Sequence, residues 1–387
     1  MNSKRLEGWT ADSDVYVGLE YPFRGERRVI PSRVLDRPGP RCWVLGPTVL
    51  LFLGTLFAAF ANLEAASPPG RHGRRAAVGP YRRYVMAIAI DPASSSRLYS
   101  CTGGGVFQSA DGGVTWETIH PGLIGRFASA VAIDPDDPST LYVGTGMGVF
   151  KKTADGVGQI VLGEGIGFVG ALAIDPTSAS TIYAGTRNGV FKSTDGGVSW
   201  TEINAGLHNV FVTSLVIDPG APATLYAATN GGGVFKSTRS GADWTPVNSS
   251  LTSMIVLTLT IDPRSPETLY AQTSEGVFRT TDGAKTWRPI NNGLASRFVL
   301  ALAIDPASPS TLYAGTAAGV FKSADGGENW TSIDNGLTNL FVSALAIDPA
   351  HPTTVYAGTN GGLFKSTSGG SSWIDLKKAN EERQTAE

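Results

Sequence analysis

Residues 301–341, ALAIDPASPSTLYAGTAAGVFKSADGGENWTSIDNGLTNLF, contain four short apolar runs separated by turn-forming sequence. The runs are ALAI, TLYAGT, GVFKS and WTSI, and the segments between and after them are DPASPS, AAG, ADGGE and DNGLTN. Asp-Pro fixes φ and starts a turn, and Gly-Gly supplies the positive φ of a tight reversal. The stretch therefore predicts four antiparallel strands, called a, b, c and d here in chain order.

The same unit recurs from about residue 85 to residue 376. Its Ile-Asp-Pro tripeptide occurs seven times, with the aspartate at Asp91, Asp134, Asp175, Asp218, Asp262, Asp305 and Asp348. Successive aspartates are 43, 41, 43, 44, 43 and 43 residues apart. Units of constant size and four strands each indicate a repeat architecture.

Stacking of these units predicts an all-β fold, a seven-bladed β-propeller of four-stranded antiparallel blades over residues 85–376. One such sheet cannot bury both faces alone, and a closed ring removes most exposed strand edges. Strand a is rich in small residues such as Ala301 and Ala303, as crowding around an axis requires. The alternative is a linear β-solenoid, whose repeats are usually much shorter. The units predict seven complete blades, and a strand exchange through residues 74–80, which align loosely with strand d, stays open.

The c–d hairpins share a second pattern, SADGGVTW (109–116), STDGGVSW (193–200), TTDGAKTW (280–287) and SADGGENW (323–330). These resemble the Asp-box, or bacterial neuraminidase repeat, Ser/Thr-x-Asp-x-Gly-x-x-Trp. Units 2, 4 and 7 depart from it, with Ile160 for Trp, Arg239 for Asp and Ser368 for Asp. The box residues with a predicted structural role are Ser109, Asp111, Gly113, Trp116, Ser193, Asp195, Gly197, Trp200, Asp282, Trp287, Ser323, Asp325, Gly327 and Trp330.

The resemblance implies that this hairpin is structural. The Asp would accept turn N–H bonds, the Gly would permit the reversal, and the Trp would add apolar area to the blade core. The repeat is found in sialidases, xyloglucan-cleaving endoglucanases, sortilin-type receptors and the photosystem II stability and assembly factor family. It therefore specifies a fold and leaves the activity open.

Few reactive residues remain outside the repeated positions. All six Trp and all seven Tyr from residue 85 onward occupy one position of each repeat and are predicted core residues. Glycoside cleavage normally needs two carboxyl groups about 5 to 10 Å apart. The repeated aspartates lie at the a–b and c–d turns, and the opposite face carries chiefly Glu164 and Glu275, three blades apart. We therefore predict no catalytic residue.

Two further positions recur in most units. Strand c carries a cation at one position, namely Lys151, Lys192, Lys236, Arg279, Lys322 and Lys365. We interpret these cations as a solvated blade edge or, alternatively, as a cationic ring for an anionic partner. The entry to strand a carries a large apolar residue, namely Tyr84, Phe127, Phe168, Phe211, Ile255, Phe298 and Phe341. We interpret these residues as packing or as a ring around the channel mouth.

The segments outside the repeats predict delivery to a membrane. Residues 1–41 read as a polar, disordered leader, and residues 42–63 (CWVLGPTVLLFLGTLFAAFANL) carry no charge. As a helix, residues 42–63 would span the ~30 Å of a bilayer core. We predict a transmembrane signal-anchor or a cleaved signal peptide, a linker at 64–84 and a charged tail at 377–387. The propeller is then secreted, periplasmic or anchored outside the cytoplasm.

Charge and composition exclude several classes of function. The net charge of -2 and the pI near 6.1 provide no large basic field for nucleic acid. The four His residues lie far apart, and Cys42 and Cys101 form no framework, so we expect no metal, no cofactor and no disulfide scaffold.

These observations favour a monomeric, non-catalytic binding or assembly module for a protein or carbohydrate ligand. The predicted surface is the face with the d–a and b–c loops, because its sequence varies from unit to unit. The candidate binding residues are Arg126, Arg187, Asn188, His208, Asn209, Asn230, Glu275, Arg297, Asn339 and Asn360. The alternatives are a secreted glycoside hydrolase, sialidase-like or xyloglucanase-like, and a chaperone similar to a photosystem II assembly factor.

Overall fold

The computed structural model describes residues 79–81, 84–124, 126–154, 159–160 and 167–386. The predicted leader (1–41), the hydrophobic segment (42–63) and nearly all of the linker lie outside these residues. Among the described helices, none combines the length and the apolar character needed to cross a bilayer.

Twenty-eight strands form seven four-stranded antiparallel sheets, each built from one contiguous stretch of chain. The first four blades are β1(Val85–Asp91), β2(Ser94–Thr102), β3(Gly105–Ser109) and β4(Glu117–Thr118); β5(Ala128–Ile133), β6(Leu141–Thr145), β7(Gly148–Lys152) and β8(Gln159–Ile160); β9(Val169–Asp175), β10(Ser178–Thr186), β11(Gly189–Ser193) and β12(Thr201–Glu202); β13(Val212–Ile217), β14(Leu225–Thr229), β15(Gly233–Ser237) and β16(Thr245–Pro246).

The other three blades follow in the same order, and two helices complete the described elements. They are β17(Val256–Ile261), β18(Leu269–Thr273), β19(Gly276–Thr280) and β20(Arg288–Pro289); β21(Val299–Ile304), β22(Leu312–Thr316), β23(Gly319–Ser323) and β24(Thr331–Ser332); β25(Val342–Ile347), β26(Val355–Thr359), β27(Gly362–Ser366) and β28(Ile374–Asp375); the 3₁₀ helix η1(Pro121–Leu123) and the helix α2(Leu376–Ala386).

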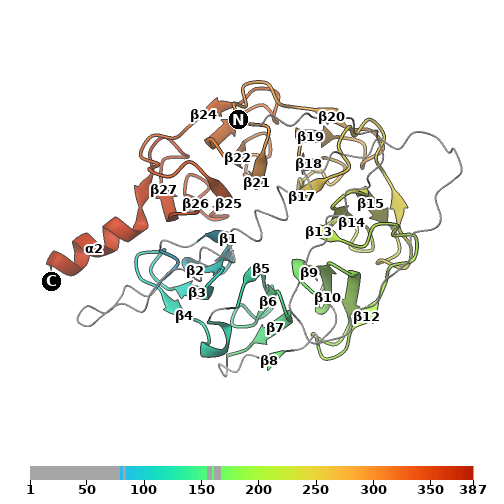
Figure 1. Ribbon diagram of the computed structural model, residues 1–387, viewed down its shortest axis with the longest axis horizontal. Helices are drawn as coiled ribbons and strands as arrows, with labels where there is room; N and C mark the ends of the chain where they lie inside the picture. Colours follow the sequence, from blue (N-terminus) through green and yellow to red (C-terminus); the bar gives the residue numbers. More distant parts are fainter. Residues whose placement is uncertain (1–78, 82–83, 125, 155–158, 161–166, 387) are drawn as a thin grey trace, which may run out of the picture. The chain divides into compact units, whose positions relative to one another are not determined.

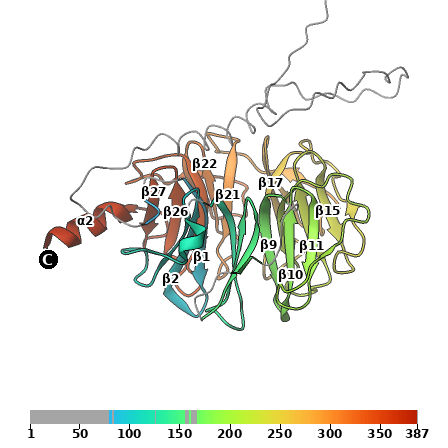
Figure 2. The same cartoon turned by 60° about the horizontal axis from the view of Figure 1, so that its bottom comes forward.

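The predicted seven-bladed propeller is confirmed. The a strands β1, β5, β9, β13, β17, β21 and β25 lie nearest the axis (Figure 1). Within a blade the strands pair in the order a-b-c-d, as the neighbours β9, β10 and β11 show from the side (Figure 2). The turns thus give the antiparallel alternation of strand direction that the sequence predicts. Strand d is only two residues long.

The hydrophobic core lies between neighbouring blades. One buried cluster joins Tyr313 and Val320 of blade 6 to Val342, Phe364 and Trp373 of blade 7. The other clusters also combine residues of adjacent blades. Each interface buries apolar side chains of both neighbouring blades. The stacking of the repeated units therefore stabilises the fold.

The box tryptophans connect blades as well as filling space. Four of them donate their indole N–H to a carbonyl of the preceding blade, as Trp330 does to Ile290 O at 2.8 Å. Trp116 and Trp200 instead donate to Gly113 O and Gly197 O of their own hairpins. Four of the six box indoles therefore also link two neighbouring blades.

The box aspartates hold their hairpins by local hydrogen bonds. Asp195 accepts the Ser199 hydroxyl at 2.5 Å, the Ser199 amide at 2.9 Å and the Ser193 hydroxyl at 2.8 Å. These bonds lower the pKa of Asp195 to about 2. The equivalent bonds, led by that from the Asn329 side chain, lower the pKa of Asp325 to about 2.

The strand c cations are not a solvated edge, which corrects the first interpretation. Lys322 Nζ lies 5.2 Å from the Tyr313 ring centroid and donates to Gly369 O of the next blade at 3.1 Å. The Tyr313 hydroxyl donates to the same carbonyl at 3.2 Å. The six cations are half-buried, and five of them, all except Lys192, donate to a hairpin carbonyl of the next blade and so act as a latch between two blades.

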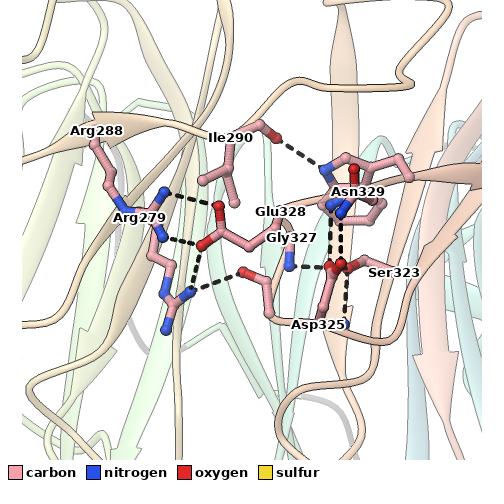
Figure 3. Close-up of polar contacts among 10 residues, drawn as sticks. Arg279, Arg288, Ile290, Ser323, Asp325, Gly327, Glu328 and Asn329 are labelled. Atoms are coloured by element: carbon pink, nitrogen blue, oxygen red, sulfur yellow. Dashed lines mark hydrogen bonds and ion pairs between the residues drawn. The ribbon is translucent and has the colours of Figure 1, made fainter.

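Blade 5 carries an arginine at the latch position (Figure 3). Arg279 donates to Gly326 O at 3.3 Å and pairs with Glu328 at 3.3 Å. Glu328 also pairs with Arg288 (Figure 3). The indole N–H of Trp330, in the same hairpin, donates to Ile290 O. The contact between blades 5 and 6 thus has an ion-pair network on its outer side.

Blade 1 closes directly against blade 7, and in the described part of the chain blade 7 is completed by its own β28. Ser343 Oγ donates to Val85 O at 2.6 Å, and Tyr356 OH donates to Gly112 O at 3.2 Å. The predicted charged tail begins as α2, whose Leu376 is buried against Gly113 of blade 1. The first turn of α2 therefore completes the seam.

Candidate functional site

The candidate site is the loop face, defined as the d–a loops and the b–c turns. Strand alternation places all of these segments at the same end of the ring. Two of the described d–a loops contact the b–c turn of the following blade. Asn209 Nδ2 donates to Asn230 O at 3.0 Å, and Thr252 Oγ1 donates to Glu275 Oε2 at 2.7 Å. The ten predicted binding residues all belong to this face.

The three predicted arginines lie in the loops or turns of blades 2, 3 and 6. The Arg126 guanidinium carbon is 5.2 Å from the Phe150 ring centroid, and its Nη1 donates to Met147 Sδ at 2.8 Å. Arg187 lies over Phe211 of blade 4 at 5.3 Å. Arg297 is exposed. The arginines thus spread over the face, and two of them stack on aromatic rings.

Several predicted polar residues maintain the loops. Asn209 Oδ1 and Asn339 Oδ1 accept the amides of Phe211 and Phe341, both at 3.1 Å. These are Asx turns, which orient the chain as it enters strand a. Asn230 accepts from Asn209 through its carbonyl. Sequence reasoning placed these residues correctly on the face but did not reveal that their amides and carbonyls are engaged there.

The remaining predicted polar residues are exposed. Asn188 and Asn360 lie on the b–c turns of blades 3 and 7. His208 is exposed in the loop before blade 4, and its ring stands edge-on to Phe235 at 6.4 Å between centroids. These side chains differ in chemistry from blade to blade, as expected of a surface that the fold does not constrain.

Of the two acids singled out for this face, Glu275 is exposed and hydrogen-bonded to Thr252, while Glu164 lies outside the described residues. Asp334 also belongs to a d–a loop, but its carboxylate accepts the Val320 amide at 2.6 Å and the Ser332 hydroxyl at 2.5 Å. Its role is therefore to hold strand c. In the described part of the chain, no group of three or more His, Cys, Asp or Glu side chains is arranged to hold a metal ion.

The large residues at the entry to strand a form a collar around the axial end of the loop face. The collar consists of Tyr84, Phe127, Phe168, Phe211, Ile255, Phe298 and Phe341. Its aromatic members are half-buried, and two neighbouring pairs contact each other, Tyr84 with Phe341 at 5.9 Å and Phe127 with Phe168 at 6.0 Å. Burial raises the pKa of Tyr84 to about 12, against the effect of a hydrogen bond with Ser343. The collar therefore combines packing with partial exposure.

Sequence reasoning missed a set of exposed apolar side chains on this face. They are Ile124, Met147, Val210, Met254 and Leu340. Val210, Met254 and Leu340 each directly precede a collar residue. Aligning the units at the position before the collar residue would have revealed Val210, Met254 and Leu340. The side chain there varies between units and is an arginine in blades 2 and 6.

The opposite face is rich in carboxylates that serve its turns. Asp134 Oδ1, for example, accepts the amides of Asp136 and Asp137 at 2.9 and 3.1 Å. The same bond from the residue two positions later recurs at Asp91, Asp175, Asp218, Asp262, Asp305 and Asp348. The seven repeated aspartates of this face are therefore engaged in structural contacts.

Residues 77–305 match the model of a family described as HVO_0234-like beta propeller. The chain belongs to this family. No curated protein sequence matches the chain significantly.

Three solved structures illustrate the range of proteins with a similar fold. A GH74 xyloglucanase from Xanthomonas campestris has a TM-score of 0.66 at 19% identity, over 78% of this chain and 55% of that enzyme. The extracellular domain of the putative one component system BT4673 from B. thetaiotaomicron has a TM-score of 0.59 at 18% identity, over 73% of this chain and 38% of that one. YCF48 from Cyanidioschyzon merolae has a TM-score of 0.57 at 14% identity, over 76% of this chain and 98% of that one.

These likenesses establish a BNR-like propeller. The chain spans about half the length of the GH74 enzyme it resembles. A GH74 xyloglucanase and the extracellular domain of a putative one component system share the architecture, so the fold does not select an activity.

Proposed function

We propose that this propeller is a non-catalytic binding module that captures a partner on its loop face. The observation that carries the proposal is the contrast between its two faces. The aspartates of the opposite face make the same turn contacts in blade after blade, whereas the exposed side chains of the loop face differ between blades. Loops that vary on a rigid scaffold are where proteins usually place binding residues.

We also propose that the module works outside the cytoplasm, either released or anchored through residues 42–63, and as a monomer. The uncharged segment supports the location, as does the extracellular domain of BT4673, which has the same fold. An assembly-factor role would use the same loop face and would differ only in the partner it holds.

The proposal is tested by capturing partners from the native membrane fraction with the full chain as bait. Joint substitution of Arg126, Arg187 and Arg297 with Ser is expected to abolish capture without lowering the melting temperature. The matched control removes three exposed cations of the opposite face, Arg239, Arg264 and Lys285, and should capture normally.

Arg126 contacts Phe150 and Met147, so a second variant leaves Arg126 in place. The double variant Arg187→Ser/Arg297→Ser separates loss of those contacts from loss of binding. Capture that is unchanged in both loop-face variants would reject this face as the binding surface.

Glycoside hydrolysis is the second candidate, favoured by the shared fold with a GH74 xyloglucanase. It is tested by incubating the full chain with xyloglucan and sialosides and measuring released sugars. Turnover that is lost in Glu275→Gln would overturn the binding-module proposal. Absence of turnover with either substrate would remove these two specificities.

A further inference from the structure

The described exposed apolar side chains are concentrated on one face of the ring. Among the described residues, the large hydrophobic side chains that are exposed are Ile124, Met147, Val198, Val210, Met254, Leu340 and Ile374. Five of these belong to the loop face, and the other two, Val198 and Ile374, lie on a c–d hairpin and on strand β28. Single exposed apolar residues are ordinary, but a group on one face marks an interaction surface.

This apolar surface lies next to the collar. Val210, Met254 and Leu340 are 42%, 38% and 45% exposed, and each is followed by a collar residue that is less exposed. The Asx turns at Asn209 and Asn339 fix two of these junctions. The face therefore offers raised aliphatic side chains around half-buried rings, an arrangement that can receive apolar side chains of a partner between them.

The charge of the loop face is complementary to carboxylates. The arginines Arg126, Arg187 and Arg297 lie on this face, and its described acids are the exposed Glu275 and the hydrogen-bonded Asp334. The repeated aspartates lie on the opposite face. Arg187 stacks on the Phe211 ring, and a guanidinium in that position keeps a planar edge of N–H donors for a carboxylate. Arg187 thus combines an apolar contact, with the Phe211 ring, and a guanidinium edge that can bind an anion.

Resting on the proposed function, we infer that the occupant of the loop face is a polypeptide segment that combines apolar side chains with carboxylates. Aliphatic and thioether side chains offer nothing to sugar hydroxyls. The tryptophans described in the propeller, which would stack on a sugar ring, are all in box hairpins. A flat anionic bilayer would touch the raised residues but would not reach the half-buried rings of the collar.

The test uses displayed random peptides of about 12 residues, selected on the full chain in detergent. Selected binders are expected to be enriched in both acidic and large apolar residues. Their affinity, measured by fluorescence anisotropy, should fall at least tenfold in Val210→Ser/Leu340→Ser and in Arg187→Ser/Arg297→Ser, roughly the loss expected when central contacts of an interface are removed. The matched control Val198→Ser/Ile374→Ser removes exposed apolar side chains elsewhere and should bind normally.

Several outcomes would overturn the inference. Binders without acidic residues, or no binders at all, would do so. Affinity for xyloglucan oligosaccharides, or for vesicles with one quarter phosphatidylglycerol, would also overturn the inference if only the loop-face variants lose that affinity. The proposed binding face would then still stand. Peptide affinity that is unchanged in both loop-face variants would reject both the inference and the proposed face.

Discussion

Gln272 is a buried amide at a position where the other blades carry small residues. It is fully buried in β18, and neither its Nε2 nor its Oε1 has a hydrogen-bond partner. The equivalent residues are Cys101, Gly144, Gly185, Ala228, Gly315 and Gly358. A Cβ at Gly358 would lie 2.5 Å from Val85 of the next blade, so a small residue here lets two blades approach closely. In blade 5 the amide occupies that space instead.

Replacing Gln272 with Leu should stabilise the protein. Leu has a similar volume and leaves no polar group without a partner, so we expect the free energy of unfolding to rise by about 1–2 kcal/mol. Urea unfolding followed by circular dichroism measures this as a higher midpoint at an unchanged slope.

The matched control is Gln384→Leu on the exposed part of α2, which should change stability by less than about 0.5 kcal/mol. A lower midpoint for Gln272→Leu would mean that the amide is hydrogen-bonded in solution, for example to a buried water.

The latch is the smallest element that links one blade to the next, through hydrogen bonds from strands b and c to a hairpin carbonyl of the following blade. Tyr313 and Lys322 lie on adjacent strands of blade 6, and both donate to Gly369 O in the hairpin of blade 7. A Cβ on Gly369 would lie 3.3 Å from Lys322 Nζ and 3.4 Å from Tyr313 OH. Glycine suits this position because of the close approach and because of its φ of 64°, although Ser240 holds the equivalent position in blade 4 at a φ of 53°.

Tyr313→Phe and Lys322→Met should each lower the free energy of unfolding, by about 0.5–1.5 kcal/mol, because each removes one hydrogen bond and keeps most of the apolar contact. Since the two donors share one acceptor, the double variant should lose less than the sum of the single losses. Urea unfolding of the four proteins completes the cycle.

Blade 3 provides the matched control. Ser240 of blade 4 replaces the hairpin glycine, and among the described contacts Tyr183 and Lys192 make no hydrogen bond to that hairpin. Tyr183→Phe and Lys192→Met should therefore cost less than their counterparts in blade 6. Equal losses in the two blades would show that the shared carbonyl contributes little to the latch.

The repeat made the blades and the loop face predictable, because turn residues and strand alternation are local properties of the sequence. The role of Lys322 was not predictable in the same way. Its partner Gly369 lies in the next repeat, and the spacing within one unit contains no information about the gap between units. The same reason hid the contact of Asn209 with Asn230, whereas the exposed Val210 and Leu340 could have been found by aligning the units.

The ring as a whole depends on the seam between blades 7 and 1. At three other seams an isoleucine after strand d packs on the following hairpin, as Ile333 does against Gly370. At this seam Leu376 takes that place against Gly113, and Asn380 of α2 hydrogen-bonds Tyr81 OH at 3.4 Å. Tyr81 in turn donates to Val114 O at 3.0 Å. The sequence left the mode of closure open, because this helical closure carries no repeat signal.

Leu376→Ala should weaken that seam. Truncation of a buried leucine typically costs about 2–5 kcal/mol, and the loss should appear as faster amide exchange in β1 and β25. Ile290→Ala removes a similarly buried side chain at the seam of blades 5 and 6 and should increase exchange there instead. Unchanged exchange in β1 and β25 would contradict a role for Leu376 in closing the ring.

The hydrogen bond from Ser343 to Val85 joins residues 258 positions apart. A ribosome adding about 5–20 residues per second needs roughly ten seconds to a minute to make that stretch of chain. Throughout that interval the flank of the first blade has no neighbour, and its apolar strand faces other nascent chains and chaperones. The order of synthesis thus makes the earliest blade the last to be covered, and it is the blade whose transient exposure most favours aggregation during biogenesis.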